Sequence, residues 1–511
     1  MAVKPPNIKE LESIAERYHF SMPRETLEQF RAIIEPLMSS YDRLDELTEP
    51  TLTTKYPDRR NWKPSAAENP VGGWYWRSEI KGAAEGPLKG RTFAIKDNVC
   101  VAGVPMMNGT RMLEGYVPQV DATIVTRILD AGGTILGKAL CESFCYSGNS
   151  HTSESGIARN PYDMTRSPGG SSTGSAALVA NHEVDMSIGC DQAGSIRIPS
   201  AWSGIYGLKP TYGLVPYSGV GPMEHTIDHT GPMARSVADV AAFLEVIAGP
   251  DGLDPRQYEA PAPSKYTAAL TGDIKGLRVG VVKEGFGLPS SQKDVDDAVR
   301  EQAGALAKLG AQVSEVSMPL HRDGFHIWAA IGFEGVLAYM IDGFGFGKNW
   351  KGYYPTDLIE TLGKAYHDKA QMLPPTVKMS ILLGRYSTDA FNGRYYARAR
   401  NLSRTLKAGY DALFDKFDIL VWPTTPMKAQ VIPGPDAPLE RKVMAAVEMI
   451  PNTCPLNVTG HPALNVPCAI SEGLPVGMMF VGPTGGDATI LRAADAYQRG
   501  VYSPPVAPRR T

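Results

Sequence analysis

Small and hydroxyl-bearing residues are concentrated in the segment 166–210, which reads RSPGGSSTGSAALVANHEVDMSIGCDQAGSIRIPSAWSGIYGLKP. Glycine and serine occur together twice in it, at 169–172 (GGSS) and at 191–195 (DQAGS). A serine nucleophile needs a proton acceptor close to its hydroxyl and backbone N–H groups directed at a developing oxyanion. Glycines also let a substrate approach the main chain closely. The segment therefore has the residue types that serine-based acyl transfer requires.

A lysine far upstream is a candidate proton acceptor. Lys96 ends the apolar run Phe93-Ala94-Ile95, which reads as a buried strand. A lysine in water has a pKa near 10.4 and is a poor base at neutral pH. Burial disfavours the ammonium form, so we expect a lowered pKa for Lys96 at this position. The alternative is an ordinary solvated charge paired with Asp97.

Together these stretches resemble the amidase signature family. The matching segments are 94–98 (AIKDN), 168–172 (PGGSS), 189–199 (GCDQAGSIRIP) and 207–211 (GLKPT), and the resemblance extends over about residues 80–500. The Asp-Gln pair ahead of the second serine, together with an additional N-terminal segment, is similar to the branch that hydrolyses amides in bacterial nitrile degradation.

The resemblance implies a Ser-Ser-Lys triad. It assigns Ser195 as the nucleophile, Ser171 as the bridging hydroxyl in a cis peptide with Gly170, and Lys96 as the base. The backbone N–H groups that it assigns to the oxyanion site belong to Gln192, Ala193 and Gly194, together with Ser195. The residues that it places around the substrate are Tyr146, Gly169, Gly170, Ile227, Trp328 and Ile450.

One residue departs from the family pattern. The family usually has two glycines before the nucleophile, and the first of them is Ala193 in this chain. If that position requires a positive φ, an alanine there costs about 1 kcal/mol and tilts an oxyanion donor.

Alternating strand and helix patterns predict an α/β protein with a β-sheet covered by helices on both faces. The resemblance implies that this is the amidase-signature fold, in which the central sheet is mixed. We expect an N-terminal helical segment and linker over residues 1–80, with a candidate dimer contact. The linker itself, at 48–80, is rich in Pro, Trp and Gly. The catalytic domain is expected over 81–505, with a variable, pocket-forming region at about 320–450.

Composition argues against several other classes of protein. The 511 residues carry a net charge of −3, so nucleic acid is not an expected partner. No apolar run approaches the roughly 20 residues that span a bilayer, so no membrane association is expected. The N-terminus lacks a signal-peptide pattern, and six dispersed cysteines indicate reduced thiols, so we expect a cytoplasmic protein. We expect no metal and no cofactor.

We therefore predict an amidase that forms a homodimer and converts aromatic or short aliphatic primary amides into carboxylate and ammonia through an acyl-enzyme. Alternatives within the family are an aryl acylamidase, a carbamate or ester hydrolase, and the glutaminase subunit of a tRNA-dependent amidotransferase. A non-catalytic scaffold, a triad using His225 or His229, and an esterase built on Ser172 in the G-x-S-x-G pattern are further alternatives. The natural substrate, stereoselectivity and oligomeric state stay open at this point.

Overall fold

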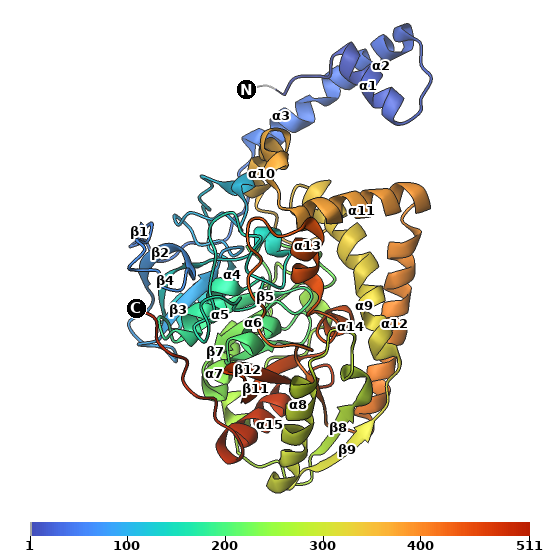
Figure 1. Cartoon of the computed structure of the whole chain (residues 1–511). Coiled ribbons are helices and arrows are strands. Elements are labelled where there is room, and N and C mark those ends of the chain that lie inside the picture. The colour runs from blue at the N-terminus through green and yellow to red at the C-terminus, as the bar shows by residue number, and fades with distance from the viewer. Residues whose placement is uncertain (1–2) are drawn as a thin grey trace. The chain divides into compact units, whose positions relative to one another are not determined.

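The computed structural model describes residues 3–511, which form two compact units, one up to Thr51 and one from Leu52 to Thr511 (Figure 1). The first unit consists of three helices: α1 (Ile8–Arg17), α2 (Arg24–Leu37) and α3 (Ser39–Glu46). α1 begins at a capping box, in which Asn7 accepts from the Glu10 N–H and Glu10 accepts from the Asn7 N–H. The buried apolar cluster of this unit contains only three fully buried side chains among the described residues, Leu11, Ala15 and Leu27.

The second unit is organised around a β-sheet of twelve strands in the described part of the chain. The strand order is β1-β2-β4-β3-β5-β7-β6-β11-β12-β10-β8-β9. β3 runs parallel to β4 and β5, and β8 runs parallel to β9 and β10, whereas the other neighbours are antiparallel. The strands are β1 (Arg60–Trp62), β2 (Trp74–Lys81), β3 (Thr92–Lys96), β4 (Thr134–Ala139), β5 (Met186–Asp191), β6 (Tyr206–Lys209), β7 (His229–Ala234), β8 (Arg278–Val282), β9 (Gln312–Val316), β10 (Ile419–Pro423), β11 (Ala463–Ser471) and β12 (Leu474–Val481).

Helices cover both faces of this sheet, as alternate residues of one strand show. Phe93 and Ile95 of β3 pack in one apolar cluster with residues of α4 and α7, and the rings of Phe93 and Phe243 lie 4.9 Å apart. Ala94, which points to the opposite face because side chains alternate along a strand, packs in another cluster with α5. The helices are α4 (Thr123–Asp130), α5 (Thr173–Ala180), α6 (Arg197–Trp202), α7 (Val237–Ile247), α8 (Lys293–Ala305), α9 (Leu320–Ala330), α10 (Thr356–Lys369), α11 (Pro375–Phe391), α12 (Arg394–Phe414), α13 (Leu439–Val447), α14 (Cys454–Thr459) and α15 (Asp487–Gly500).

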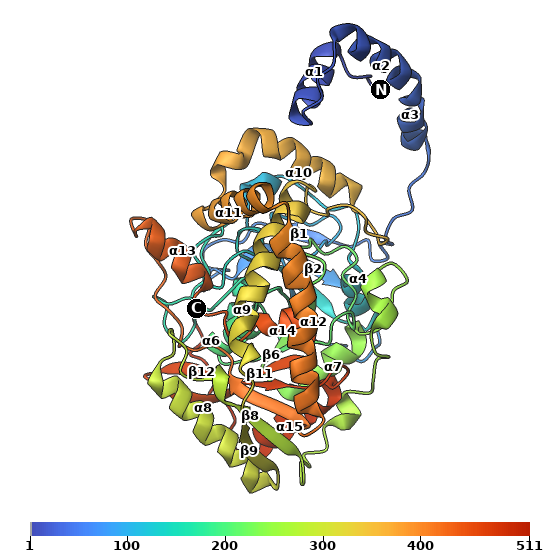
Figure 2. The same ribbon diagram turned by 90° about the vertical axis from the view of Figure 1, so that its right-hand side faces the viewer.

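The long helices of the variable region lie beside the sheet. α9 and α12 run side by side (Figures 1 and 2), and α9 continues through two π-helical stretches to Ile341. The stretch Leu320–Ile341 is long and apolar enough to cross a membrane, but 61% of its most apolar window is buried inside the protein. Packing against the rest of the protein therefore accounts for its apolar character.

The predicted α/β fold with a mixed sheet and N-terminal helices is confirmed. The sequence predicts a linker over residues 48–80. The structure differs from this prediction, because the segment contributes β1 and β2 to one end of the sheet. β2 carries Trp74 and Ile80 in the core but leaves Tyr75, Trp76 and Arg77 half-buried. Such a strand lacks the regular alternation by which strands are usually identified.

Candidate active site

A buried lysine and a serine are in direct contact where β3 ends. Lys96 is fully buried, and its Nζ donates to Ser171 Oγ at 2.7 Å and to the Cys190 carbonyl oxygen at 3.2 Å. The parallel pairing of β3 with β5 brings Lys96 near Cys190, although the two residues are 94 positions apart. The expected contact between Lys96 and Ser171 is thus present in the structure.

Close packing of the main chain fixes the loop that carries Ser171. The Gly170–Ser171 peptide bond is cis, and Gly169 has a φ of +86°. A Cβ atom on Gly169 would lie 2.6 Å from the Pro199 Cα, and one on Gly170 would lie 2.7 Å from the Ser147 carbonyl oxygen. Both positions therefore need glycine because backbone atoms of other segments occupy the space of a side chain.

An ion pair without solvent exposure braces the loop between β5 and α6. Asp191 accepts two hydrogen bonds from the Arg197 guanidinium at 2.9 and 3.0 Å, and both side chains are fully buried. The carboxylate also accepts from the N–H groups of Gly194 at 2.7 Å and Ile196 at 3.0 Å. Burial would raise the pKa of Asp191, but the Arg197 charge and these hydrogen bonds hold it well below its ordinary value.

The carbonyl groups of the same loop are held by side chains from distant segments. Trp328 Nε1 donates to the Gln192 carbonyl oxygen at 2.8 Å, and Thr453 Oγ1 donates to the Ala193 carbonyl oxygen at 2.5 Å. Within residues 3–511 the N–H groups of Gln192, Ala193 and Ser195 have no protein acceptor, whereas the Gly194 N–H is taken by Asp191. Three of the four expected oxyanion donors are therefore free to bind a ligand.

Alanine at position 193 is compatible with the loop conformation. Positive φ angles occur at Gly194, with +138°, but not at Ala193. The strain that the sequence suggests for Ala193 is therefore absent, and the conformational requirement falls on the next residue.

Replacing Gly194 by alanine should lower kcat/KM for an amide by about a hundredfold, the size of effect seen when one oxyanion donor is lost. A Cβ atom there would lie 2.3 Å from Thr453 Oγ1, so the loop must shift and its N–H groups with it. Steady-state kinetics with circular dichroism as a folding check would measure this. Gly473→Ala is the control, because Gly473 also has a positive φ but its added Cβ meets nothing within 4 Å. Equal kinetic losses in both variants would contradict the prediction.

Burial and neighbouring thiols act on the pKa of Lys96 in opposite directions. Burial by itself lowers the pKa of Lys96, but Cys145, Cys190 and Cys141 lie close enough to raise the pKa of this amine above its ordinary value. Burial likewise raises the pKa of Cys145, but a hydrogen bond with Cys141 and the charge of Lys96 bring it down to about 6. The lowered pKa that burial predicts for Lys96 is therefore wrong, because the neighbouring thiols raise this pKa.

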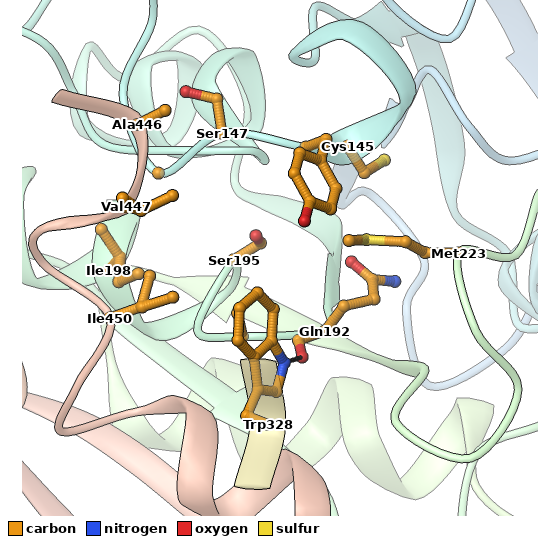
Figure 3. A pocket seen from close by; sticks show the side chains of 13 residues that line it. Cys145, Ser147, Gln192, Ser195, Ile198, Met223, Trp328, Ala446, Val447 and Ile450 are labelled. Carbon is orange, nitrogen blue, oxygen red and sulfur yellow. Dashed lines mark hydrogen bonds between the residues drawn. The ribbon is translucent and has the colours of Figure 1, made fainter. Parts of the chain in front are cut away.

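A small cavity lies over Ser195. Its volume is about 30 Å³, enough for roughly two water molecules, so side chains must move to admit most acyl groups. Ser195 is 6% exposed, and Tyr146, Trp328 and Ile450 line the same cavity, as expected from the family resemblance. Figure 3 shows Ile198, Val447 and Ile450 on one side of Ser195, and Cys145, Met223 and Gln192 on the other.

Other candidate residues lie away from this cavity. Ile227 is fully buried in the main apolar cluster, and its carbonyl oxygen accepts from His229 Nδ1 at 2.8 Å. Neither His229 nor His225, which stacks on Trp350 at 3.9 Å, lines the cavity. Ser172 is tied to β5, because its hydroxyl donates to the Cys190 carbonyl oxygen at 3.2 Å. Gly169 and Gly170 shape the loop behind Ser171 and are not among the cavity-lining residues.

Several lining side chains are not among the substrate-binding candidates of the sequence analysis. Cys145 precedes Tyr146 directly, so the neighbouring candidate could have drawn attention to it. Met223 lies in an irregular segment, and the Gln192 side chain was overlooked because only its backbone was assigned a role. The remaining unassigned lining residues are Ser147, Gly148, Ile198, Ala446 and Val447.

Comparison with known proteins gives the same family along most of the chain. The model of the family described as Amidase matches residues 75–491. A protein named enantioselective amidase, from Rhodococcus rhodochrous, is 45% identical over 511 residues, an alignment that covers 99% of this chain and 98% of the relative.

Solved structures agree with this comparison. The native peptide amidase from Stenotrophomonas maltophilia superposes with a TM-score of 0.68 at 30% identity, over 83% of this chain and 85% of the other. One component of the glutamyl-tRNA(Gln) amidotransferase from Thermotoga maritima superposes with a TM-score of 0.71 at 26% identity, over 86% of this chain and 91% of the other.

Proposed function

Because the chain belongs to the amidase signature family and hydrolyses amides, we propose that Ser195 is its nucleophile, Ser171 its bridging hydroxyl and Lys96 its general base. The observation that carries the proposal is the 2.7 Å hydrogen bond between Lys96 Nζ and Ser171 Oγ, with both residues fully buried. Ser195 Oγ makes no hydrogen bond within residues 3–511 and faces the cavity. Ser195 Oγ forms its hydrogen bond with Ser171 when substrate binds, since catalytic hydrogen bonds often tighten only in the complex.

The reaction then follows two proton-balanced steps. Ser195 Oγ forms a bond to the amide carbon, while its proton passes to Ser171 and the Ser171 proton passes to a neutral Lys96. The C–N bond breaks as the nitrogen takes a proton from Ser171, which is refilled from Lys96, and ammonia leaves. Water attacks the resulting ester of Ser195 along the same relay and releases the carboxylate. The reactive form is the one in which Cys145 holds its proton and Lys96 is an amine.

The free N–H groups of Gln192, Ala193 and Ser195 stabilise the oxyanion in both steps. They are held in place by the bonds from Trp328 and Thr453 to the carbonyl groups of the loop, so they need no reorganisation during the reaction. The small apolar end of the cavity favours a short aliphatic or a flat aromatic acyl group.

Trapping of the acyl-enzyme tests this assignment. Incubation with a primary amide and hydroxylamine should give the hydroxamate, and the Ser195→Ala variant should give none. Ser172→Ala should keep the activity, because Ser172 is bound to β5 and does not line the cavity. Loss of hydroxamate in Ser172→Ala with survival in Ser195→Ala would favour the separate esterase. Glutamine as the best substrate would favour the glutaminase of an amidotransferase.

Replacing Cys145 by alanine should move the acidic limb of the kcat/KM profile to lower pH by about one to two units. Lys96 acts as a base only when neutral, and the nearby sulfurs raise its pKa. Removal of one sulfur lowers that pKa, so the neutral amine persists to lower pH. The control is Cys468→Ala, a buried thiol whose Sγ donates to the Val476 carbonyl oxygen in the β11–β12 hairpin. A shift to higher pH, or the same shift in both variants, would contradict the coupling.

We also propose that the N-terminal unit joins two copies of the chain in a homodimer. It buries few apolar side chains, and larger ones stay exposed, among them Ile33 at 61% and Leu44 at 65%. Large apolar side chains that a unit leaves exposed in number commonly belong to a protein interface. A homodimer would bury the apolar side chains that the N-terminal helices cannot bury against one another.

Light scattering coupled to size-exclusion chromatography tests the dimer. Ile33→Asp should give monomers with an unchanged circular dichroism spectrum, because the side chain is exposed in the single chain and its replacement leaves the fold of that chain intact. Leu439→Asp, at a position that is 66% exposed in the second unit, is the matched control and should stay dimeric. A wild type that elutes as a monomer at micromolar concentration would refute the dimer.

We propose a cytoplasmic location on the basis of the thiols. All six cysteines are free and buried, and both Cys141 and Cys145 donate to Asn108 Oδ1 without forming a disulfide. Free thiols are typical of reducing compartments. Fractionation of cells that express the full chain would test the location.

A further inference from the structure

The side chain of Gln192 presents an unused acceptor to the cavity. Gln192 is 1% exposed, and its Oε1 has no hydrogen-bond partner among the residues that the structure describes. A buried carboxamide oxygen without a partner costs free energy, so such an atom in a ligand cavity indicates a missing donor. Gln192 lines the same cavity as Ser195.

The orientation of this carboxamide follows from the groups on its other side. Gln192 Nε2 donates to the Tyr217 hydroxyl oxygen at 2.8 Å. The nitrogen also faces Asp228 and forms a hydrogen bond with its carboxyl group. Burial raises the pKa of Asp228 to about 8, and this hydrogen bond lowers the same pKa. With the nitrogen bonded on that side, Oε1 is left to the cavity. Figure 3 shows the oxygen turned toward the centre of the cavity and the nitrogen turned away.

The two ends of the cavity differ in chemistry. Ile198, Val447 and Ile450 form an apolar end, and Figure 3 shows Gln192 on the opposite side of Ser195, where Cys145 also lies. Cys145 contacts the relay, because hydrogen bonds with Ser171 and Lys96 contribute to its lowered pKa. The nitrogen of a bound amide must lie at the relay end, since it takes its proton from Ser171. The acyl group is then left to the apolar end.

From this arrangement we propose that Gln192 Oε1 accepts a hydrogen bond from the N–H of the scissile amide and thereby selects amides over esters of the same acid. The proposal rests on Ser195 as the nucleophile and adds a specificity-determining residue to it. An ester has no N–H, so it leaves Oε1 without a hydrogen bond from the substrate in a buried site. A site built to hydrogen-bond a substrate group discriminates against analogues that lack this group.

The test compares propionamide with methyl propionate, which share an acyl group, in the wild type and in Gln192→Met. Methionine has a similar length, keeps the backbone N–H and lacks the acceptor. We expect kcat/KM for the amide to fall about tenfold, the effect of one lost hydrogen bond, and kcat/KM for the ester to change by less than about twofold. Tyr217→Phe, which frees the carboxamide to rotate, should give a smaller loss that is also confined to the amide.

Met223→Leu is the matched control, because Met223 lines the same end of the cavity and has no acceptor of comparable strength. It should change the amide and the ester rates in the same proportion. A Gln192→Met variant that lowers both rates equally, or lowers neither, would overturn the proposal, as would an altered amide-to-ester ratio in Met223→Leu. A wrong assignment of the nucleophile would show in a different experiment, because the Ser195→Ala variant would then keep its activity.

Discussion

Replacement of Lys96 by alanine should lower kcat for a primary amide by about a thousandfold or more at neutral pH. The variant loses the amine that contacts Ser171 at 2.7 Å, so the relay lacks both the acceptor of the serine proton and the donor that returns it. General base catalysis contributes about a hundredfold to ten-thousandfold, and here the same group also returns the proton to the leaving nitrogen. Ammonia release under saturating substrate measures the effect.

A second buried lysine provides the control for this experiment. Lys209 is fully buried, and its Nζ donates to the Pro210 carbonyl oxygen at 3.2 Å. Burial lowers the pKa of Lys209, and this amine has no contact with Ser171 or Ser195 among the hydrogen bonds of the described residues, so exchange for an apolar methionine leaves the relay intact. Lys209→Met should keep kcat within about threefold, as expected for a group outside the relay. Wild-type kcat in Lys96→Ala would refute the relay, and equal losses in both variants would point to general damage.

Combining Lys96→Ala with Ser195→Ala should cost little more than either change alone. Groups that act as one unit are strongly non-additive, because the first removal already disables the others. If the two losses multiplied instead, Lys96 and Ser195 would act independently, and the two residues would not belong to one proton relay.

The candidate triad of Lys96, Ser171 and Ser195 comes from the family resemblance, which rests on short segments whose residue types are constrained locally. A lysine after an apolar strand and serines next to glycines can be identified without knowledge of the fold. Their contact depends on β3 pairing with β5, which alternating strand and helix patterns suggest but do not specify residue by residue.

The surroundings of Lys96 could not be predicted in the same way. Cys145 reaches the amine through an irregular turn in which Phe144 and Cys145 both have positive φ angles, 49° and 61°. Non-glycine residues rarely adopt this conformation, so no propensity argument places the sulfur there. The Cys145 sulfur in that turn is the first of three thiols that raise the pKa of Lys96 against the lowering by burial.

The lining of the cavity shows the same limit. Trp328 was a candidate on family resemblance, and the structure adds a reason for its position, namely the hydrogen bond from its Nε1 to the Gln192 carbonyl oxygen. Ile227 was a candidate on the same grounds but is turned into the core. Both residues are apolar and both are buried, so only three-dimensional contacts distinguish a cavity wall from ordinary packing.

The Asp191→Ala variant should be less stable than the wild type by about 3–5 kcal/mol, because it leaves the Arg197 guanidinium buried without its counter-charge. Both side chains of this pair have no solvent exposure. The variant also frees the N–H groups of Gly194 and Ile196, so the oxyanion loop loses its shape along with its stability. Urea unfolding followed by tryptophan fluorescence would measure the change in the free energy of unfolding.

A double replacement distinguishes two causes of the lost stability, the unpaired buried charge and the lost packing. Asp191→Leu with Arg197→Met removes both charges and should regain most of the stability, since apolar pairs often replace buried ion pairs without loss. It should not regain activity, because no group is left to hold the Gly194 N–H. Equal stability of Asp191→Ala and the double variant would show that the unpaired charge is not the cause.

The pH dependence of stability gives an independent measure of the same pair. The pKa of Asp191 lies well below its ordinary value in the folded protein, whereas an unfolded chain has an aspartate pKa of about 3.9. Because the folded pKa is depressed, the stabilisation is fully present above the unfolded value and is lost as the pH falls toward the folded value. Asp191→Asn should therefore flatten the decline in unfolding free energy below about pH 4, and an unchanged decline would mean that other carboxylates cause it.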